Sequence, residues 1–410
     1  MAIAVVQGAR ARTSWAQVST PLIGREDTEF AEAVALEERW VNPLTLTTMK
    51  MKRSRSKTID VHWWEDAYLP YIDQVNYGTG YNSTDTDITV DYGEYFAVGD
   101  LVRDMASNEV VLVTSISSDV LTVTRDFGQS TESWTALAAS IADNAYLEIL
   151  GNAFEPGHTF PSVRSTTDVE KINYCQDIRT PVSMTEITRD TQLHGGQDWA
   201  YQVKKSQTEH QHKIERGNWW GKPYRSDKGN YASATGNTAP AACGGINHFI
   251  SYYADADHKV DQDDLTEFEF MDFLEIAFDK GSRSKALWCS SALRTGFDKW
   301  GISRQNTFET THVLGMKISE WQSSQGHLFI YSHDMLKRPS TSHYNYAFVL
   351  DMECLEWVTF GPNGSTRFRK AGNHENTGET LDKAEFQTIS CIKMELPNNH
   401  ARLKYKTISV

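Results

Sequence analysis

Two different hydrophobic patterns follow one another along the chain. Between residues 81 and 155, short runs of apolar and β-branched residues are separated by Gly, Asp, Asn and Ser. Such runs between turn residues are typical of β-strands. The runs are 87–92, 99–104, 109–116, 120–127 and 145–150, and residues 117–119 form a hairpin turn between two of them. Strands this short and this closely spaced predict a small β-barrel or sandwich.

The longest helical pattern covers residues 197–220. It starts near Asp198, which can cap a helix, and continues through good helix formers. Its apolar positions make only a narrow stripe along one side. We therefore expect a long polar helix that depends on neighbouring elements for its stability.

The rest of the chain alternates between helices and strands. Helices are predicted at 27–40, 265–281 and 291–301, and strands at 57–70, 285–290, 313–321, 327–332, 344–351 and 354–360. Residues 170–190 form an extended stretch that Pro181 interrupts, and 384–408 form a hairpin-like strand pair around residues 397–399. The helix at 265–281 is expected to bury one apolar face, made by Phe268, Met271, Leu274 and Phe278. Together, these helices and strands predict an α+β protein.

Length and charge limit the classes of protein. A chain of 410 residues predicts two or three packed units. Its net charge of -14 disfavours a protein whose main function is to bind nucleic acid. No apolar run is long enough to cross a membrane, and the start does not resemble a signal peptide. The five cysteines include no CxxC pair, so we expect free, buried thiols.

Motifs that would indicate catalysis or a cofactor are missing from the sequence. There is no GxxxxGK[ST] or GxGxxG phosphate loop, no GxSxG elbow and no HExxH. Residues 255–264 are rich in aspartate, but they lack the central glycine and the closing glutamate of a calcium loop. We expect an acidic surface loop there, and no cofactor.

The stretch 208-TEHQHKIERGNWWGK-222 raises the question of a metal site. His210 and His212 are two residues apart, so on a helix they point in nearly opposite directions and cannot share a metal. Glu209 and His212 have the spacing of helical metal ligands, which keeps a metal site as the alternative. The favoured interpretation is a solvated helix, in which Glu209 and Glu215 form ion pairs along the helix or with another subunit.

The end of this helix is the more informative part of the stretch. Gly217 and Gly221 are predicted to stop the helix. Between them, Trp219 and Trp220 are predicted to fix its end to the rest of the domain.

One short segment departs from the acidic character of the chain. The stretch 50-KMKRSRSK-57 is strongly basic. Such a run is most often a solvated arm or a contact with a partner, and the alternative is a contact with phosphate.

The order of these parts resembles the Hong Kong 97-type major capsid proteins of tailed bacteriophages, in the branch with a β-rich insertion in the extended loop. The resemblance covers roughly residues 40 to 408. It is carried by 62-HWWEDAYLP-70, 99-GDLVRD-104, 110-VVLVTSISSDVLTVTRDFG-128, 215-ERGNWWGK-222, 243-CGGI-246 and 390-SCIKMELPNNHARL-403. It implies an α+β Hong Kong 97-type capsid fold with an inserted small β-barrel or sandwich domain.

The resemblance also implies a division of the chain. Residues 1–50 would be the N-terminal arm, and 51–190 the extended loop, which the inserted β-rich domain at 80–155 interrupts. Residues 191–289 would be the peripheral domain, with 197–220 as its spine helix. Residues 290–375 would be the axial domain, and 376–410 the closing strands of the peripheral domain.

The function implied is that of a major capsid protein, which is not an enzyme. It would assemble in the host cytoplasm into the icosahedral shell of the virion and enclose the packaged double-stranded DNA, touching it by weak non-specific contacts. Its partners would be copies of itself in pentamers and hexamers, with scaffolding, portal and cement or decoration proteins, and no membrane. Candidate subunit contacts are basic and aromatic residues near the extended loop: Lys52, Arg53, Arg55, Lys57, Trp63, Trp64 and Tyr68. For the basic residues we favour an acidic patch on a neighbour over DNA.

Two other classes of function stay open at this level. A hydrolase with an accessory carbohydrate-binding β-domain would need a deep pocket with paired carboxylates from separate segments. A phage surface or receptor-binding protein would use the β-rich part as its main functional region.

Overall fold

The computed structural model describes residues 52–127, 140–157, 161, 163–190, 198–225, 240–304, 309–313, 316–322, 325–361, 365–369 and 381–409. The predicted helix at 27–40 lies outside these residues. The chain divides into two compact units, one of His62–Ile172 and one of Met1–Val61 with Asn173–Val410. Among the described helices, none is long and apolar enough to span a membrane.

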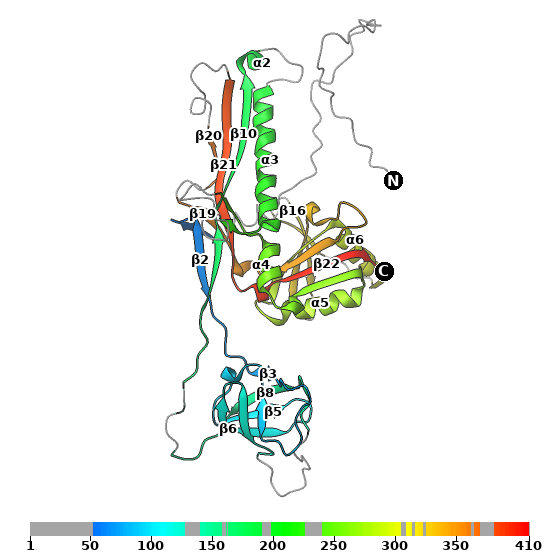
Figure 1. The fold of residues 1–410 in the computed structure, drawn as a ribbon. Coiled ribbons are helices and arrows are strands. Elements are labelled where there is room, and N and C mark those ends of the chain that lie inside the picture. Colours follow the sequence, from blue (N-terminus) through cyan, green and yellow to red (C-terminus); the bar gives the residue numbers. More distant parts are fainter. Residues whose placement is uncertain are drawn as a thin grey trace. The chain divides into compact units, whose positions relative to one another are not determined.

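The first unit is built around a closed β-barrel (Figure 1). Its strands are β3 (Ile72–Gln74), β4 (Asp87–Thr89), β5 (Asp100–Asp104), β6 (Val110–Ser117), β7 (Val120–Thr124) and β8 (Tyr146–Asn152), with a short 3₁₀ helix η2 (Gly93–Tyr95). The sheet order is β3-β8-β5-β6-β7-β4. An antiparallel bridge between Val75 and Val90 joins the two ends of this order. The predicted runs coincide with β4 to β8, whereas β3 is too short to show a period.

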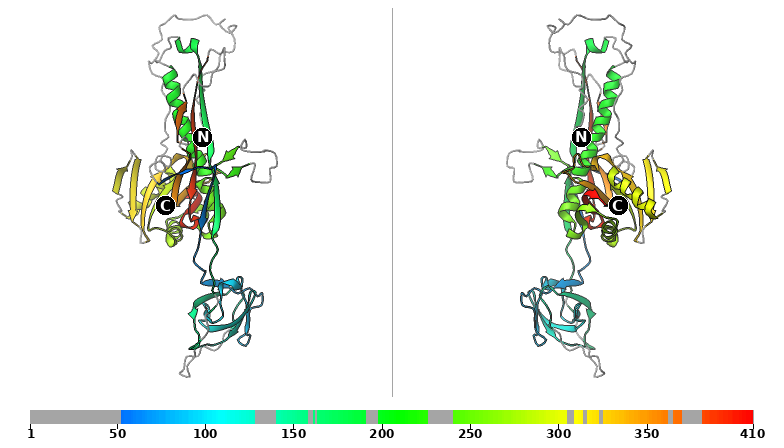
Figure 2. Two further views of the ribbon diagram at one scale, coloured as in Figure 1. Left: turned by 90° about the vertical axis from the view of Figure 1, so that its left-hand side faces the viewer. Right: turned by 90° about the vertical axis from the view of Figure 1, so that its right-hand side faces the viewer.

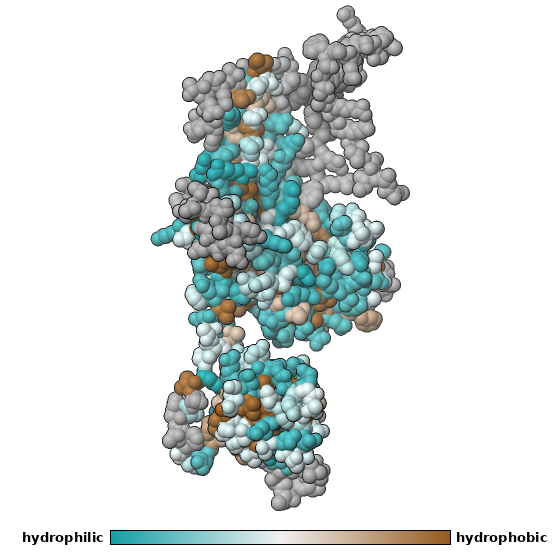
Figure 3. Space-filling view, in the orientation of Figure 1, coloured by the Kyte–Doolittle hydropathy of each residue, from teal (hydrophilic) through white to brown (hydrophobic). Residues whose placement is uncertain are grey.

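The barrel is filled by alternate residues of its strands. Val102, Val111, Val113, Leu121 and Val123 are all buried in one cluster. Outward positions include exposed apolar side chains as well, and hydrophobic residues gather on the barrel face that carries β8 and β5 (Figure 3). Among the residues of this unit, the exposed large side chains include Tyr146, Leu150 and Met105.

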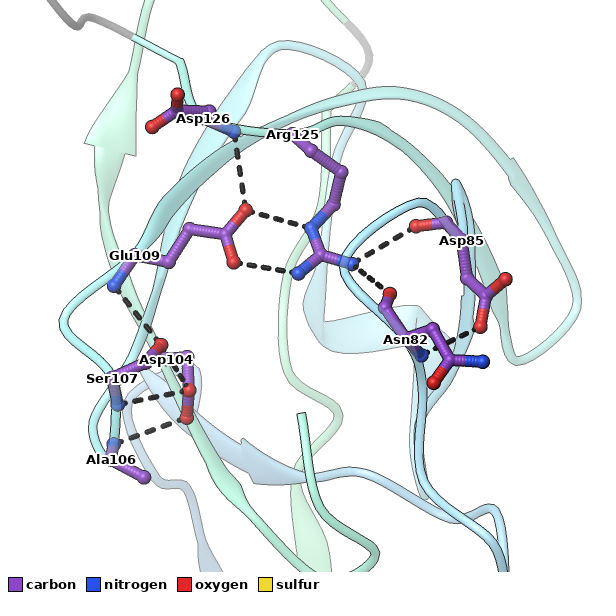
Figure 4. A network of polar contacts seen from close by, with 8 residues as sticks. All are labelled: Asn82, Asp85, Asp104, Ala106, Ser107, Glu109, Arg125 and Asp126. Carbon is purple, nitrogen blue, oxygen red and sulfur yellow. Dashed lines mark hydrogen bonds and ion pairs between the residues drawn. The ribbon is translucent and has the colours of Figure 1, made fainter. Parts of the chain in front are cut away.

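A buried ion pair fixes the turn before β6 to the end of β7 (Figure 4). The Arg125 guanidinium donates from Nε to Glu109 Oε1 at 2.7 Å and from Nη2 to Oε2 at 2.6 Å. Its Nη1 donates to the carbonyls of Asn82 and Asp85, each at 3.0 Å. Because both charged groups are buried and bidentate, they hold three separate segments in place.

Removing Arg125 should destabilise the barrel strongly, because it would leave the Glu109 carboxylate buried without its cation. We expect Arg125→Met to cost about 3–5 kcal/mol. The matched control is Arg103→Met, whose ion pair with Glu148 is partly exposed, and it should cost less than about 1 kcal/mol. Native-state hydrogen exchange of the β6 and β7 amides measures both. Equal losses of protection in the two variants would contradict the stronger role of the buried pair of Arg125 and Glu109.

The second unit contains a sheet that runs along a long helix. The sheet has the order β1-β19-β21-β10, and β20 also pairs with β21. Its strands are β1 (Arg53–Ser56), β19 (Leu355–Phe360), β21 (Leu381–Met394), β10 (Gln176–Thr185) and β20 (Arg367–Arg369). The helix α3 (Asp198–Trp220) packs along β10 and β21, as Figures 1 and 2 show. This contact supplies the neighbours that the polar helix was expected to need.

A seven-stranded sheet forms the rest of the core of this unit. Its order is β13-β22-β18-β14-β17-β16-β15. The strands are β13 (Lys259–Leu265), β14 (Ser284–Cys289), β15 (Glu309–Val313), β16 (Met316–Gln322), β17 (His327–Ser332), β18 (Asn345–Leu350) and β22 (Ala401–Ile408). Helices α5 (Glu267–Asp279) and α6 (Ser291–Arg304) pack against it through Phe270, Phe273, Leu293 and Phe297.

Smaller elements connect these layers. Strands β2 (Asp60–Glu65) and β9 (Val169–Tyr174) form a two-stranded sheet, as do β11 (Tyr224–Arg225) and β12 (Ala241–Ala242). Short helices are α2 (Glu186–Asp190), α4 (Ile246–Tyr253), η3 (Ala256–His258), η4 (Asp334–Leu336), η5 (Met352–Cys354) and η6 (Pro397–Asn399). The five cysteines are free, and four of them are buried, as expected.

The predicted hairpin at 384–408 is wrong. The strands β21 and β22 follow each other in sequence, but β21 pairs with β10 and β19, whereas β22 pairs with β13 and β18. Leu396 adopts a left-handed conformation before Pro397, and η6 follows before β22 begins. The two strands therefore lie in different sheets.

The predicted interruption at Pro181 is also wrong. Pro181 lies inside β10, opposite Glu385 of β21. In the sheet order β10 is a terminal strand, where the missing N–H of proline leaves no bond unmade.

The buried face of α5 differs from the predicted one. Phe270, Phe273, Leu274 and Ala277 are buried, while Phe268 is 75% exposed. The apolar residues were spaced for two overlapping helical faces, and packing against the sheet selected one of them.

The acidic stretch at 255–264 is a strand for most of its length, not a loop. In β13, Asp261 pairs with Arg402 and Lys404, and Asp263 with Lys406, all on the adjacent strand β22. The cations that stabilise this strand are distant in sequence, so the local pattern could not show them.

The seven-stranded sheet also spans the expected domain boundaries. Strand β14, which precedes residue 290, pairs with β17 and β18. Strand β18 in turn pairs with β22, which follows residue 376. The expected peripheral and axial segments thus share one sheet, because strand pairing follows tertiary contacts rather than chain order.

Candidate assembly surfaces

The end of α3 is anchored in the core by Trp219. Its side chain is fully buried, with ring centroids 5.1 Å from Phe348 and 6.0 Å from Trp288. Trp220 packs edge-on against Tyr346 at 4.8 Å. These partners lie on β14 and β18, so the tryptophans fix the helix to the seven-stranded sheet. The tryptophans were expected to fix the helix to the peripheral domain, whereas their partners Tyr346 and Phe348 belong to the segment expected to be axial.

A buried polar pair reinforces this junction. Glu215 and His333 are almost completely inaccessible, and Glu215 Oε1 lies 2.6 Å from His333 Nε2. The Met335 amide donates to His333 Nδ1. Both Glu215 Oε1 and the Trp219 indole nitrogen, at 3.3 Å, lie within hydrogen-bond distance of His333 Nε2. The prediction that Glu215 makes a surface or intersubunit ion pair is therefore wrong, because this side of α3 faces the sheet. Glu209 does form an exposed ion pair along the helix, with Lys205 at 4.0 Å.

Close backbone packing surrounds the last turn of α3. A Cβ on Gly221 would lie 2.3 Å from the carbonyl oxygen of Cys243, and one on Gly245 would lie 2.8 Å from that of Asn218. The Gly221 amide donates to Gly217, and the Gly245 amide to Gly221. Gly217 lies within the helix and does not stop it, which corrects the prediction. Directly after the helix, the segment around Gly245 packs against its last turn and bonds the carbonyl of Gly221.

The two glycines of this helix end should respond in opposite ways to alanine. A Cβ on Gly217 would meet only Gln176 Oε1, at 3.9 Å. Gly217→Ala should therefore raise the free energy of unfolding by about 0.5–1 kcal/mol, because glycine is a poor helix former. Gly221→Ala should lower it by about 1–3 kcal/mol through the backbone clash. Urea unfolding of the unassembled chain measures both, and a destabilised Gly217→Ala would contradict the packing.

His210 is a core residue rather than an exposed one. It is completely buried between α3 and the sheet. Its Nδ1 lies 3.0 Å from Thr180 Oγ1 on β10, and its Nε2 lies 2.8 Å from Thr388 Oγ1 on β21. Burial, with a smaller effect of Lys213, lowers the pKa of His210 to about 4. Within the described residues, no group of three or more His, Cys, Asp or Glu side chains is placed to hold a metal ion.

The pKa of His210 predicts an acid-sensitive core. In the unfolded chain the imidazole takes up a proton near pH 6.5, whereas in the folded chain it stays neutral down to about pH 4. Stability should fall as pH decreases through this window, by up to roughly 1.4 kcal/mol per pH unit from this group. His210→Gln should flatten the slope. Part of the remaining slope should come from His400, whose pKa burial lowers to about 3, and part from His248 and His258, whose pKa values burial also lowers. Urea titrations at several pH values test this, and an unchanged slope would contradict it.

The basic segment forms an ordered edge strand. Arg53 to Ser56 pair in parallel with Trp357 to Phe360 of β19, the only neighbour of β1 among the described strands. Lys52, Arg53, Arg55 and Lys57 are exposed, and Ser54 and Ser56 are half-buried. Arg53 and Arg55 are two residues apart in β1 and share one face of the strand, and Lys57 follows directly after the strand ends. Within the part of the chain that the structure describes, none of the four forms an ion pair.

The aromatic candidates divide into two groups. Trp63 is 5% exposed, and its Nε1 donates to Glu65, so it is held inside its own chain and is not a surface anchor. Trp64 is 64% and Tyr68 98% exposed. Large aromatic side chains this exposed are typical of interface anchors.

The described surface thus exposes a row of cations that form no ion pair within the described residues, and two large aromatic side chains. The model of the SU10 major capsid protein family matches residues 31–407, and the chain belongs to this family. It is a major capsid protein that forms the icosahedral shell of a bacteriophage. The hydrolase and receptor-binding alternatives are thereby set aside.

Solved structures with a similar fold include phage capsids. The capsid of a native GTA particle is 8% identical with a TM-score of 0.43, covering 98% of this chain and 100% of that chain. Mycobacterium phage Bobi is 7% identical with a TM-score of 0.41, covering 92% and 96%. Microbacterium phage Oxtober96 is 8% identical with a TM-score of 0.44, covering 93% and 96%. No curated protein matches the chain. The described residues form a mixed helix and sheet fold, and membership of the capsid family rests on the match of the family model.

Proposed function

We propose that the chain assembles into rings of five and six copies, which close into a shell around double-stranded DNA in the host cytoplasm. The match to a major capsid protein family over residues 31–407 is the observation that carries this proposal. Many modest contacts per subunit then sum to a stable shell. The protein acts as a structural subunit and not as an enzyme.

The β-barrel serves as an outward-facing module of the subunit, inserted in the extended loop. Two observations support this role. The unit His62–Ile172 is compact and has a hydrophobic cluster of its own. Its outer face also exposes Tyr146 and Leu150 at 53% and 51%, which suits contacts with neighbouring subunits or with a cement or decoration protein.

The basic strand β1 contacts a neighbouring subunit rather than the genome. A net charge of -14 makes the whole chain a weak ligand for DNA, which allows the genome to move during packaging. Trp64 and Tyr68 act as aromatic anchors of the same kind of contact. Scaffolding and portal proteins complete the set of partners during assembly.

Assembly of the purified chain tests the proposal. Negative-stain electron microscopy should show ring-shaped oligomers, tubes or closed shells. Replacing Trp64 and Tyr68 by serine should raise the protein concentration needed for assembly at least about tenfold, because buried aromatic anchors contribute about 2 kcal/mol or more each.

Val163→Ser is the matched control, because Val163 is an exposed apolar residue, at 81%, but is not aromatic. It should leave the assembly concentration unchanged. A monodisperse monomer under all salt conditions would contradict the proposal as a whole.

A further inference from the structure

Two rows of like charge stand on different surfaces of the second unit. The first is the basic row of Arg53 and Arg55 on β1, with Lys57 directly after the strand. The second lies on α5, where Asp272, Glu275 and Asp279 are all exposed. Their spacings of three and four residues place them along one side of the helix. Both rows belong to the same compact unit.

Each row is unfavourable within its own chain. Like charges three or four residues apart on a helix repel each other. Asp279 is also in the last turn of α5, where the helix dipole disfavours an anion, and no basic residue lies in that turn. Within the described ranges, the three acidic side chains form no ion pair in their own chain. Opposite charge from outside the chain would relieve both rows.

The two rows match each other in length. Residues two apart on a strand are separated by roughly 6.6 Å, so Arg53 and Arg55 lie about that far apart, and with Lys57 after the strand end the basic row spans at most about 13 Å. A helix rises about 1.5 Å per residue, so Asp272 to Asp279 span about 10.5 Å. Three cations can therefore lie over three anions without a gap.

An exposed aromatic ring extends the acidic row. Phe268 is 75% exposed and lies one turn before Asp272 on the same side of α5. Packing against the sheet does not use this side chain, since the core contains Phe270 and Phe273 instead. A ring next to carboxylates suits an arginine, which can stack on the ring and bind the acids.

We propose that β1 of one subunit docks onto the exposed face of α5 of a second copy of this chain, with Arg53, Arg55 and Lys57 over Asp272, Glu275 and Asp279. The proposal rests on the capsid function proposed above. Because the two surfaces differ, the contact is head-to-tail, and head-to-tail contacts form rings when the rotation closes. The contact would therefore hold neighbours within a pentamer or hexamer.

A charge swap tests the pairing. We expect the basic-row variant Arg53→Glu, Arg55→Glu, Lys57→Glu to raise the assembly concentration at least tenfold, and the acidic-row variant Asp272→Lys, Glu275→Lys, Asp279→Lys to do the same. The two sets combined in one chain should restore assembly, because the pairs form again with reversed polarity. Circular dichroism of each unassembled variant checks folding.

A matched control changes the same charge elsewhere. The variant Asp87→Lys, Asp91→Lys, Glu94→Lys reverses three exposed acids of the barrel unit and should leave assembly unchanged. Normal assembly of the acidic-row variant would overturn the proposal. A folded combined variant that stays defective would overturn it as well.

Other binding partners of β1 would give different results in the charge-swap experiment. If only the basic-row variant is defective, the partner of β1 is either packaged DNA or the acid-rich sequence 26–38, and the α5 contact is wrong. Loss of binding to a labelled DNA duplex would then identify DNA.

Disulfide trapping separates this contact from shell formation. A mixture of Arg55→Cys chains and Glu275→Cys chains should form a covalent dimer under mild oxidation with oxidised glutathione, whereas either variant alone should not. A dimer without shells would support the contact and contradict the shell. Shells without the mixed dimer would support the shell and overturn the contact.

Discussion

The junction between the end of α3 and the seven-stranded sheet is the constraint on which the second unit depends. Trp219 packs against Trp288 of β14 and Phe348 of β18, and the buried bond between Glu215 and His333 fixes the helix beside it. A buried carboxylate is costly unless it is hydrogen-bonded, so this bond also selects one position of the helix. The polar helix α3 has little apolar surface of its own. The contacts at its C-terminal end therefore fix its position.

This junction relates the two sheets of the unit to each other. The helix α3 lies along β10 and β21, where His210 bonds Thr180 and Thr388, and its end enters the other sheet. The basic row lies at β1, in the first of these sheets. The acidic row lies on α5, which packs against the seven-stranded sheet. Their relative position is therefore set by buried contacts, and a surface contact between subunits can repeat with the same rotation, as a ring requires.

Charge has a different role in the interior and on the surface. Inside, single bidentate or hydrogen-bonded pairs such as Arg125 with Glu109 hold segments that are distant in sequence. Outside, rows of like charge remain unpaired in the described chain. Buried pairs add to the stability of the subunit, whereas unpaired rows are more useful for association, because they gain opposite charge only when subunits meet.

The sequence by itself determined the α+β class, the strands of the barrel, the long helix and the order of parts typical of capsid proteins. Local periodicity and turn residues were sufficient for these, since they depend on neighbours in the chain. It did not determine that β21 and β22 separate into two sheets, that α5 buries Phe270 and exposes Phe268, or that His210 and Glu215 are core residues. The tertiary structure decided these, because each depends on which distant strand lies opposite, and a polar residue on a helix is buried or exposed only once that partner is in place.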